Sequence, residues 1–168
     1  MTEDNVSRIV RESCHAWPGY EGHSLEVGLR ILRAYHFFDQ ELVRGLAEFD
    51  VSPGEFGVLF NLRLAGPPYR MTPTQLYNRL LVTSGGMTGR IDRLQRRGLV
   101  CRLPDPEDRR SILVELTERG LEHFEGVART HLHIMEHLTA GLTSEERDCL
   151  AGLLRKLLFG IESSYGKP

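Results

Sequence analysis

Residues 72–98, TPTQLYNRLLVTSGGMTGRIDRLQRRG, decide the fold of this chain. TPTQ (72–75) is a capping box with a proline at the first helical position, and a short helix follows it. VTS (82–84) ends that helix and caps another, which Gly98 terminates at its C′ position. The second helix buries a stripe of apolar side chains with a four-then-three spacing: Met87, Ile91 and Leu94. The stretch therefore predicts two short helices joined by a tight turn.

A β-hairpin with a polar tip is predicted directly after these helices. Leu99–Leu103 and Ser111–Leu116 are rich in aliphatic and β-branched residues, whereas PDPEDRR (104–110) between them is charged and contains two prolines. Two short helices followed by a hairpin form a winged helix-turn-helix, which we place between about Met71 and Leu116.

Amphipathic helices are predicted on both sides of this motif. Before it, apolar residues recur at helical spacing from Ser24 to about Phe49, and Ser52-Pro53 starts a shorter helix. After it, one helix runs from Thr117 to Leu138, and a capping box at 143–146 starts a leucine-rich last helix. These helices carry more apolar surface than so small a motif can cover. We therefore predict that they bury this surface against a second copy of the chain, as a homodimer.

The predicted fold class is mainly α with a small β-hairpin wing, a winged helix-turn-helix flanked by N- and C-terminal dimerisation helices. Residues 1–23 form an N-terminal extension that holds one short helix at about 5–16. Residues 24–65 contain the N-terminal dimerisation helix and a linking helix. Residues 66–117 form the winged helix-turn-helix lobe, and residues 118–168 form the C-terminal dimerisation helices.

Positive charge is concentrated in one third of the chain. The whole chain has 21 basic and 23 acidic residues, a net charge of −2, but residues 69–119 carry ten Arg and six acidic residues, a net charge of +4. The remainder carries 11 basic and 17 acidic residues, a net charge of −6. A basic surface confined to one motif is typical of contact with nucleic-acid phosphates. The winged helix-turn-helix is therefore predicted to bind double-stranded DNA.

The second short helix is the predicted DNA-reading element. Opposite its buried stripe it places small residues, among them Gly85, Thr88 and Gly89, and arginines follow within two turns. Small residues let the helix backbone approach the major groove closely, and a helix N-terminus attracts phosphate. At the hairpin tip, an arginine can enter the minor groove, and Asp108 is placed to hold that cation. The alternatives are an ordinary amphipathic helix with a basic face and a solvated charged turn.

Several classes of protein are excluded or disfavoured. No run of about 18 apolar residues occurs and the N-terminus lacks a signal-peptide core, so we expect a cytoplasmic protein. Three scattered cysteines form no C-x-x-C pair, which argues against a disulfide framework or a cysteine zinc site. No glycine-rich nucleotide loop follows a strand, so we expect neither an enzyme nor a cofactor. A winged helix that binds only other proteins is the remaining alternative of a different class.

These residues carry a family resemblance. TPTQL (72–76), SGGMTGRIDRL (84–94), RGLV (97–100), DPEDRR (105–110) and ELTERG (115–120) together resemble the MarR family of bacterial regulators. The most specific part is the wing that ends in Leu-Thr-x-x-Gly, and the resemblance covers about residues 24–165. It implies a dimer with interleaved terminal helices, palindromic operators, and usually repression that a small molecule or an oxidant relieves. It also implies that Asp108 and Arg110 are the wing pair, with Arg109 as the alternative inserted residue.

The predicted DNA-contacting residues lie at the starts of both short helices, along the second helix and at the wing tip. They are Thr72, Thr74, Gln75, Ser84, Gly85, Gly86, Thr88, Arg90, Arg93, Arg96, Asp108, Arg109 and Arg110.

A small aromatic acid is the first candidate ligand. One branch of the family, which responds to urate, has an extra N-terminal segment with a tryptophan, two arginines and an aspartate before the helix-turn-helix. Trp17 matches the tryptophan, and Arg90 and Arg102 match the arginines. The aspartate position falls at Gly57, so the acidic residue of that branch is missing. The resemblance therefore implies a planar anion held by Arg90 or Arg102.

Two other signals remain open. Cys14 lies near Trp17 and Tyr20, and His15 beside it can lower the pKa of its thiol, as redox sensing requires. On the helix after the wing, the spacing of His133 and His137 can place two zinc ligands on one face. The third histidine of that helix, His131, lies close by, but a third zinc ligand would have to come from elsewhere. Solvated histidines are the alternative, and we predict no metal site.

Overall fold

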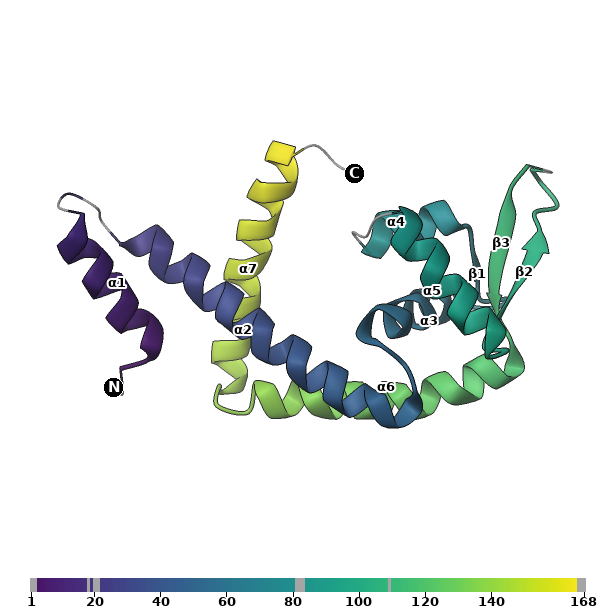
Figure 1. Cartoon of the computed structure of the whole chain (residues 1–168), viewed down its shortest axis with the longest axis horizontal. Coiled ribbons are helices and arrows are strands. Elements are labelled where there is room, and N and C mark those ends of the chain that lie inside the picture. Colours follow the sequence, from purple (N-terminus) through teal and green to yellow (C-terminus); the bar gives the residue numbers. More distant parts are fainter. Residues whose placement is uncertain (1–2, 18, 20–21, 81–83, 109, 166–168) are drawn as a thin grey trace. The chain divides into compact units, whose positions relative to one another are not determined.

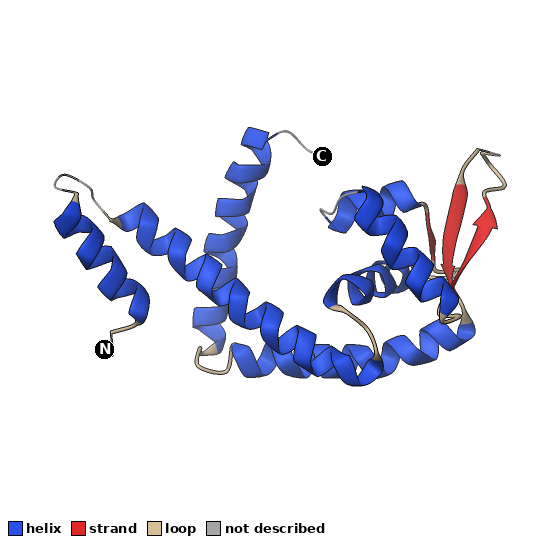
Figure 2. Cartoon of the chain, in the orientation of Figure 1, coloured by secondary structure: helices blue, strands red, loops and turns tan. Residues whose placement is uncertain are grey.

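The computed structural model describes residues 3–17, 19, 22–80, 84–108 and 110–165. The chain divides into two compact units, residues 1–41 and 42–168. Figure 2 shows that helices account for most of the described residues and that the strands are gathered in one place. The fold class predicted from the sequence is thereby confirmed, and no helix in the described ranges is long and apolar enough to cross a membrane.

The first unit contains helix α1 (Asn5–Ala16) and most of helix α2 (His23–Leu46). Asp4 caps α1, because its Oδ1 accepts a hydrogen bond from the backbone N–H of Ser7 at 2.8 Å. The same carboxylate forms an ion pair with Arg30 of α2, with 3.0 Å between Nε and Oδ2. The short N-terminal helix predicted at about 5–16 is therefore confirmed, and an ion pair fixes it to α2.

The second unit contains the winged helix-turn-helix (Figure 1). The end of α2 runs into a 3₁₀ turn at Ala47–Phe49, and Asp50 follows with a left-handed backbone, φ 53°. The remaining helices are α3 (Pro53–Leu64), α4 (Pro73–Leu80), α5 (Ser84–Arg96), α6 (Glu118–Leu138) and α7 (Ser144–Tyr165). The long N-terminal helix thus ends at Leu46, three residues before the predicted boundary.

The wing belongs to a small antiparallel sheet whose strands lie in the order β1-β3-β2. Strands β2 (Val100–Pro104) and β3 (Ile112–Leu116) form the predicted hairpin, with Val100 opposite Leu116. Strand β1 (Arg70–Met71) pairs with the other edge of β3. The sequence did not indicate β1, because two residues are too few to show an alternating pattern.

The core of the second unit surrounds α3. Its Val58, Leu59 and Leu62 are fully buried, and the helix packs against α4, α5, α6 and β3. The predicted apolar stripe of α5 is confirmed, because Met87, Ile91 and Leu94 are at most 2% exposed. None of the buried residues in this core belongs to α7.

Helix α7 instead carries an exposed apolar stripe. Its large aliphatic side chains recur at steps of three and four, so they lie on one face of the helix. In the single chain each is between 36% and 62% exposed. The stripe consists of Leu150, Leu153, Leu154, Leu157, Leu158 and Ile161.

Candidate nucleic-acid interface

The start of α4 is built by the predicted capping box. The side chain of Gln75 accepts a hydrogen bond from the backbone N–H of Thr72 at 2.8 Å, and Thr72 Oγ1 accepts one from the N–H of Gln75 at 3.2 Å. Thr74 and Gln75 are exposed. Thr72 and Gln75, both predicted DNA contacts, therefore also fix the first turn of the helix that precedes α5.

The first turn of α5 presents little side-chain bulk. The helix begins at Ser84, and Gly85, Gly86 and Thr88 are exposed. A Cβ added at Gly85 would meet nothing within 4 Å. Another chain can therefore approach the backbone of this turn closely, as the prediction requires. The predicted break and cap at 82–83 lie outside the described residues.

The arginines of α5, and Arg97 directly after its end, have different surroundings. Arg90 is half-buried against the first turn of α3, because a Cβ at Gly54 would lie 2.5 Å from its Cζ. Arg97 donates from Nη2 to the carbonyl of Phe49 at 3.0 Å, and its Nε lies 3.4 Å from Oδ2 of Asp50. Arg96 is exposed, and its Nε donates to the carbonyl of Asp92 in its own helix at 3.4 Å.

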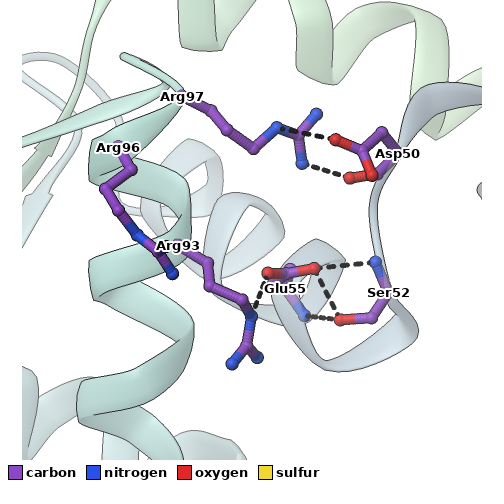
Figure 3. Close-up of a pocket in the computed structure, with 6 residues that line it drawn as sticks. All are labelled: Asp50, Ser52, Glu55, Arg93, Arg96 and Arg97. Carbon is purple, nitrogen blue, oxygen red and sulfur yellow. Dashed lines mark hydrogen bonds and ion pairs between the residues drawn. The ribbon is translucent and has the colours of Figure 1, made fainter.

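Arg93 forms an ion pair that the sequence analysis missed. Its Nε donates to Oε1 of Glu55 at 2.7 Å, across a hollow of about 500 Å³ between α5 and the start of α3 (Figure 3). Glu55 also closes the capping box of α3, accepting hydrogen bonds from the backbone N–H and the hydroxyl of Ser52. Burial alone would raise the pKa of Glu55, but the hydrogen bonds from Ser52 and Arg93 hold that pKa below its usual value.

The wing tip is organised by backbone hydrogen bonds. Asp108 Oδ1 accepts from the backbone N–H of Arg110 at 2.9 Å, and the carbonyl of Asp108 accepts from the N–H of Ser111 at 2.8 Å. The carboxylate thus orders the turn, whereas the sequence led us to expect that it holds the guanidinium. The side chain of Arg110 is exposed, and Arg109 lies outside the described residues.

The residues predicted to hold a ligand lie in different surroundings. Arg102 of β2 donates from Nη2 to Oδ1 of Asp92 at 2.6 Å and also bonds Gln95. With Arg96 these residues line a second hollow, of about 610 Å³. Trp17 belongs to the first unit and is 66% exposed.

Gly57, the position of the missing aspartate, lies where α3 packs closely against α4 and leaves no space for a side chain. A Cβ there would lie 2.8 Å from Cδ2 of Leu80. A larger side chain at this position therefore requires Leu80 to move, so the glycine also serves the packing of α4 on α3.

The histidines of α6 differ in burial. The ring of His131 stacks on Phe56 with 4.5 Å between centroids, and burial lowers its pKa. His133 and His137 are exposed. Within the described ranges, no three His, Cys, Asp or Glu side chains are grouped so as to hold a metal ion. Cys14 is partly buried, and its thiol lies where a Cβ on Gly22 would collide with it.

Three features occur together in this unit: the short capped helix α4, the helix α5 with its small first residues and basic side chains, and the small sheet that carries the wing. They define a winged helix-turn-helix DNA-binding protein. Residues 49–111 match the sequence profile of the MarR family. The chain is 29% identical over 152 residues to the HTH-type transcriptional regulator PecS of Dickeya dadantii, covering 90% of this chain and 92% of PecS.

Two solved structures are similar over most of the chain. A cysteine-to-serine mutant of Escherichia coli MarR complexed with operator DNA is 30% identical, with a TM-score of 0.72, covering 93% of this chain and 99% of that chain. BpsR of Bordetella bronchiseptica, whose DNA binding is regulated by 6-hydroxynicotinic acid, is 27% identical, with a TM-score of 0.73, covering 84% of this chain and 97% of that chain. The chain belongs to the MarR family of transcriptional regulators, and it is not an enzyme.

Proposed function

We propose that this protein is a repressor that binds a palindromic operator as a homodimer. The observation that carries the proposal is the first turn of α5, where exposed small residues are followed by arginines and lie in the same unit as the wing. Helix α5 enters the major groove, and an arginine of the wing tip enters the adjacent minor groove. The exposed apolar stripe of α7 supports the dimer, since two recognition helices are needed to read two half-sites about 34 Å apart.

Operator binding by this protein should be specific and should depend steeply on salt. Each phosphate that an arginine neutralises releases a counterion, so affinity for the protein's own promoter region should fall as salt concentration rises. Titration of that duplex and of a random duplex, at matched salt and followed by fluorescence anisotropy, measures both properties. Equal affinity for the two duplexes would contradict the proposed function.

Arg110→Ala should weaken operator binding about tenfold, since a dimer loses two groove contacts. The slope of log affinity against log salt should decrease by about two for the same reason. The control is Arg129→Ala, which removes an exposed arginine of α6 outside the predicted interface. Both variants should remain dimeric in size-exclusion chromatography. Wild-type operator affinity in the Arg110→Ala variant would show that Arg110 does not contact the DNA.

The ligand that releases the operator is a small aromatic acid held by Arg102 or Arg90. Two observations support this part of the proposal. Arg102 lines a hollow of about 610 Å³ next to Arg96, a predicted DNA contact. The similar regulator BpsR has its DNA binding regulated by 6-hydroxynicotinic acid, which is an aromatic acid. Because Arg102 contacts Asp92 of α5, an anion that attracts its guanidinium acts directly on the recognition helix.

The aromatic acid 6-hydroxynicotinic acid is the first probe of this site. If it binds the folded protein, it should raise the melting temperature and weaken operator binding in the same concentration range. Arg102→Gln should abolish the thermal shift, whereas Arg155→Gln, on the exposed surface of α7, should retain it. A change in the fluorescence of Trp17, the single tryptophan, reports whether the N-terminal unit forms part of the site. No thermal shift with this or other small aromatic acids would contradict the ligand proposal.

A further inference from the structure

Glu55 connects the start of α3 to the recognition helix through both of its carboxylate oxygens. Oε2 accepts hydrogen bonds from the backbone N–H of Ser52 at 2.9 Å and from its Oγ at 2.7 Å. Oε1 accepts one from Nε of Arg93 at 2.7 Å. Since the capping box fixes one oxygen, the other is presented to Arg93 in a fixed direction.

The loop that carries this capping box is also attached to the end of α5. Arg97, one turn after Arg93, donates to the carbonyls of Phe49 and Asp50 and forms an ion pair with the Asp50 carboxylate. Figure 3 shows both arginines extending from α5 toward this loop. Two neighbouring turns of the recognition helix thus hold the segment in which Glu55 lies.

The pair is asymmetric in exposure. The Glu55 side chain is 7% exposed, but the Arg93 side chain is 49% exposed. Arg93 donates to Glu55 from its Nε. Its Nη1 lies beside the preceding turn of α5, 3.5 Å from the position that a Cβ on Gly89 would occupy. Among the described residues, no protein group accepts a hydrogen bond from either Nη nitrogen. Both Nη nitrogens of a guanidinium held through its Nε, with four N–H donors between them, therefore remain available on the predicted DNA-contacting side of α5.

We propose that Glu55 is a positioning residue for DNA binding, which fixes the Arg93 guanidinium so that its Nη nitrogens donate to an operator phosphate. The inference rests on the proposed function, in which α5 lies in the major groove. A long side chain that is already fixed loses less conformational entropy when it binds, so its hydrogen bonds contribute more to affinity. The buried carboxylate does not reach the DNA itself, and its part is to hold the guanidinium in one orientation.

The loss of negative charge and the loss of Arg93 positioning predict opposite changes in the operator affinity of Glu55→Gln. Removal of a carboxylate near DNA makes the interface more positive, so electrostatics alone predicts tighter binding to every duplex. A glutamine can keep the Ser52 cap with its carbonyl oxygen, but it then turns an N–H₂ group toward Nε of Arg93 and cannot accept from it. Positioning therefore predicts about tenfold weaker binding to the promoter duplex, from two protomers, and weaker binding to random duplex as well, because a phosphate contact carries no sequence information.

The test compares Glu55→Gln with Glu146→Gln in the full-length dimer. Glu146 closes the capping box of α7 in the same way, accepting from the N–H of Thr143 at 2.8 Å, so this control makes the same chemical change away from α5. In an Arg93→Gln background, Glu55→Gln should cause no further loss of promoter affinity. An undiminished loss there would show that Glu55 acts through the fold of α3, and unchanged or tighter promoter binding by the single variant would overturn the proposal.

Arg93→Lys keeps the charge and leaves the α3 cap intact, so it tests the same idea even if Glu55→Gln does not fold. A lysine ammonium can bind Glu55 or a phosphate, but it lacks the planar guanidinium whose separate nitrogens can donate to both at once. We expect promoter affinity to fall severalfold, and wild-type affinity in this variant would also overturn the proposal. If the wild-type protein does not prefer the promoter duplex over random duplex, the proposed function is wrong. That result is distinct from a failure of the Glu55 proposal, which concerns only the variants.

Discussion

Gly120→Ala should lower the free energy of unfolding by about 3 kcal/mol, because a Cβ at this position would overlap a backbone atom. The added carbon would collide with the carbonyl oxygen of Leu99 and lie 2.8 Å from its carbonyl carbon. The neighbouring contacts prevent an easy adjustment. Thr117 donates from its hydroxyl to the carbonyl of Gly98 at 2.7 Å and from its N–H to the carbonyl of Leu99 at 3.1 Å.

Chemical denaturation at a fixed protomer concentration measures this effect, since dimerisation makes stability depend on concentration. The melting temperature should fall by roughly 6–12 °C. Gly141→Ala is the matched control, because a Cβ at Gly141 meets nothing within 4 Å, and it should change stability by less than about 0.5 kcal/mol. A Gly120→Ala protein as stable as this control would show that the start of α6 can move away from Leu99.

This glycine also shows what the sequence could predict. The Leu-Thr-x-x-Gly signature at 116–120 identified the family, and its physical basis is the close approach of α6 to the backbone that follows α5. Capping boxes at the starts of α4 and α7 were predictable for a related reason. Their hydrogen bonds join residues three apart, so the pattern and the contact lie in the same short stretch.

Contacts between distant segments could not be predicted in the same way. Arg93 and Glu55 are 38 residues apart, and their pairing depends on how α5 packs against the start of α3. Glu55 itself carried a signal, since it stands three residues after Ser52 in a capping box, but nothing in that spacing shows a second partner on another helix. The hydrogen bond from the backbone N–H of Arg110 to Asp108 joins residues only two apart, but it depends on the turn that the wing adopts, which the residue pattern does not specify.

The largest expected effect on DNA binding comes from α7, which does not contact DNA in the proposed function. Leu154→Glu combined with Leu157→Glu should convert the dimer to monomers and weaken operator binding by about 10²–10³-fold, since one recognition helix then binds without its partner. Each leucine contributes about 1.5–3 kcal/mol when an interface buries it, and a carboxylate there adds a desolvation cost. Size-exclusion chromatography with light scattering, followed by operator titration, measures both changes.

Ser163→Glu is the control, because Ser163 is exposed and lies on the opposite side of α7 from the apolar stripe. It adds a negative charge to the same helix and should leave the dimer and its operator affinity unchanged. Since no buried core residue of the winged helix-turn-helix belongs to α7, the double variant should keep the fold of that motif and its weak affinity for random duplex. A double variant that stays dimeric would show that the apolar stripe of α7 is not the dimer contact and that another helix face must supply it.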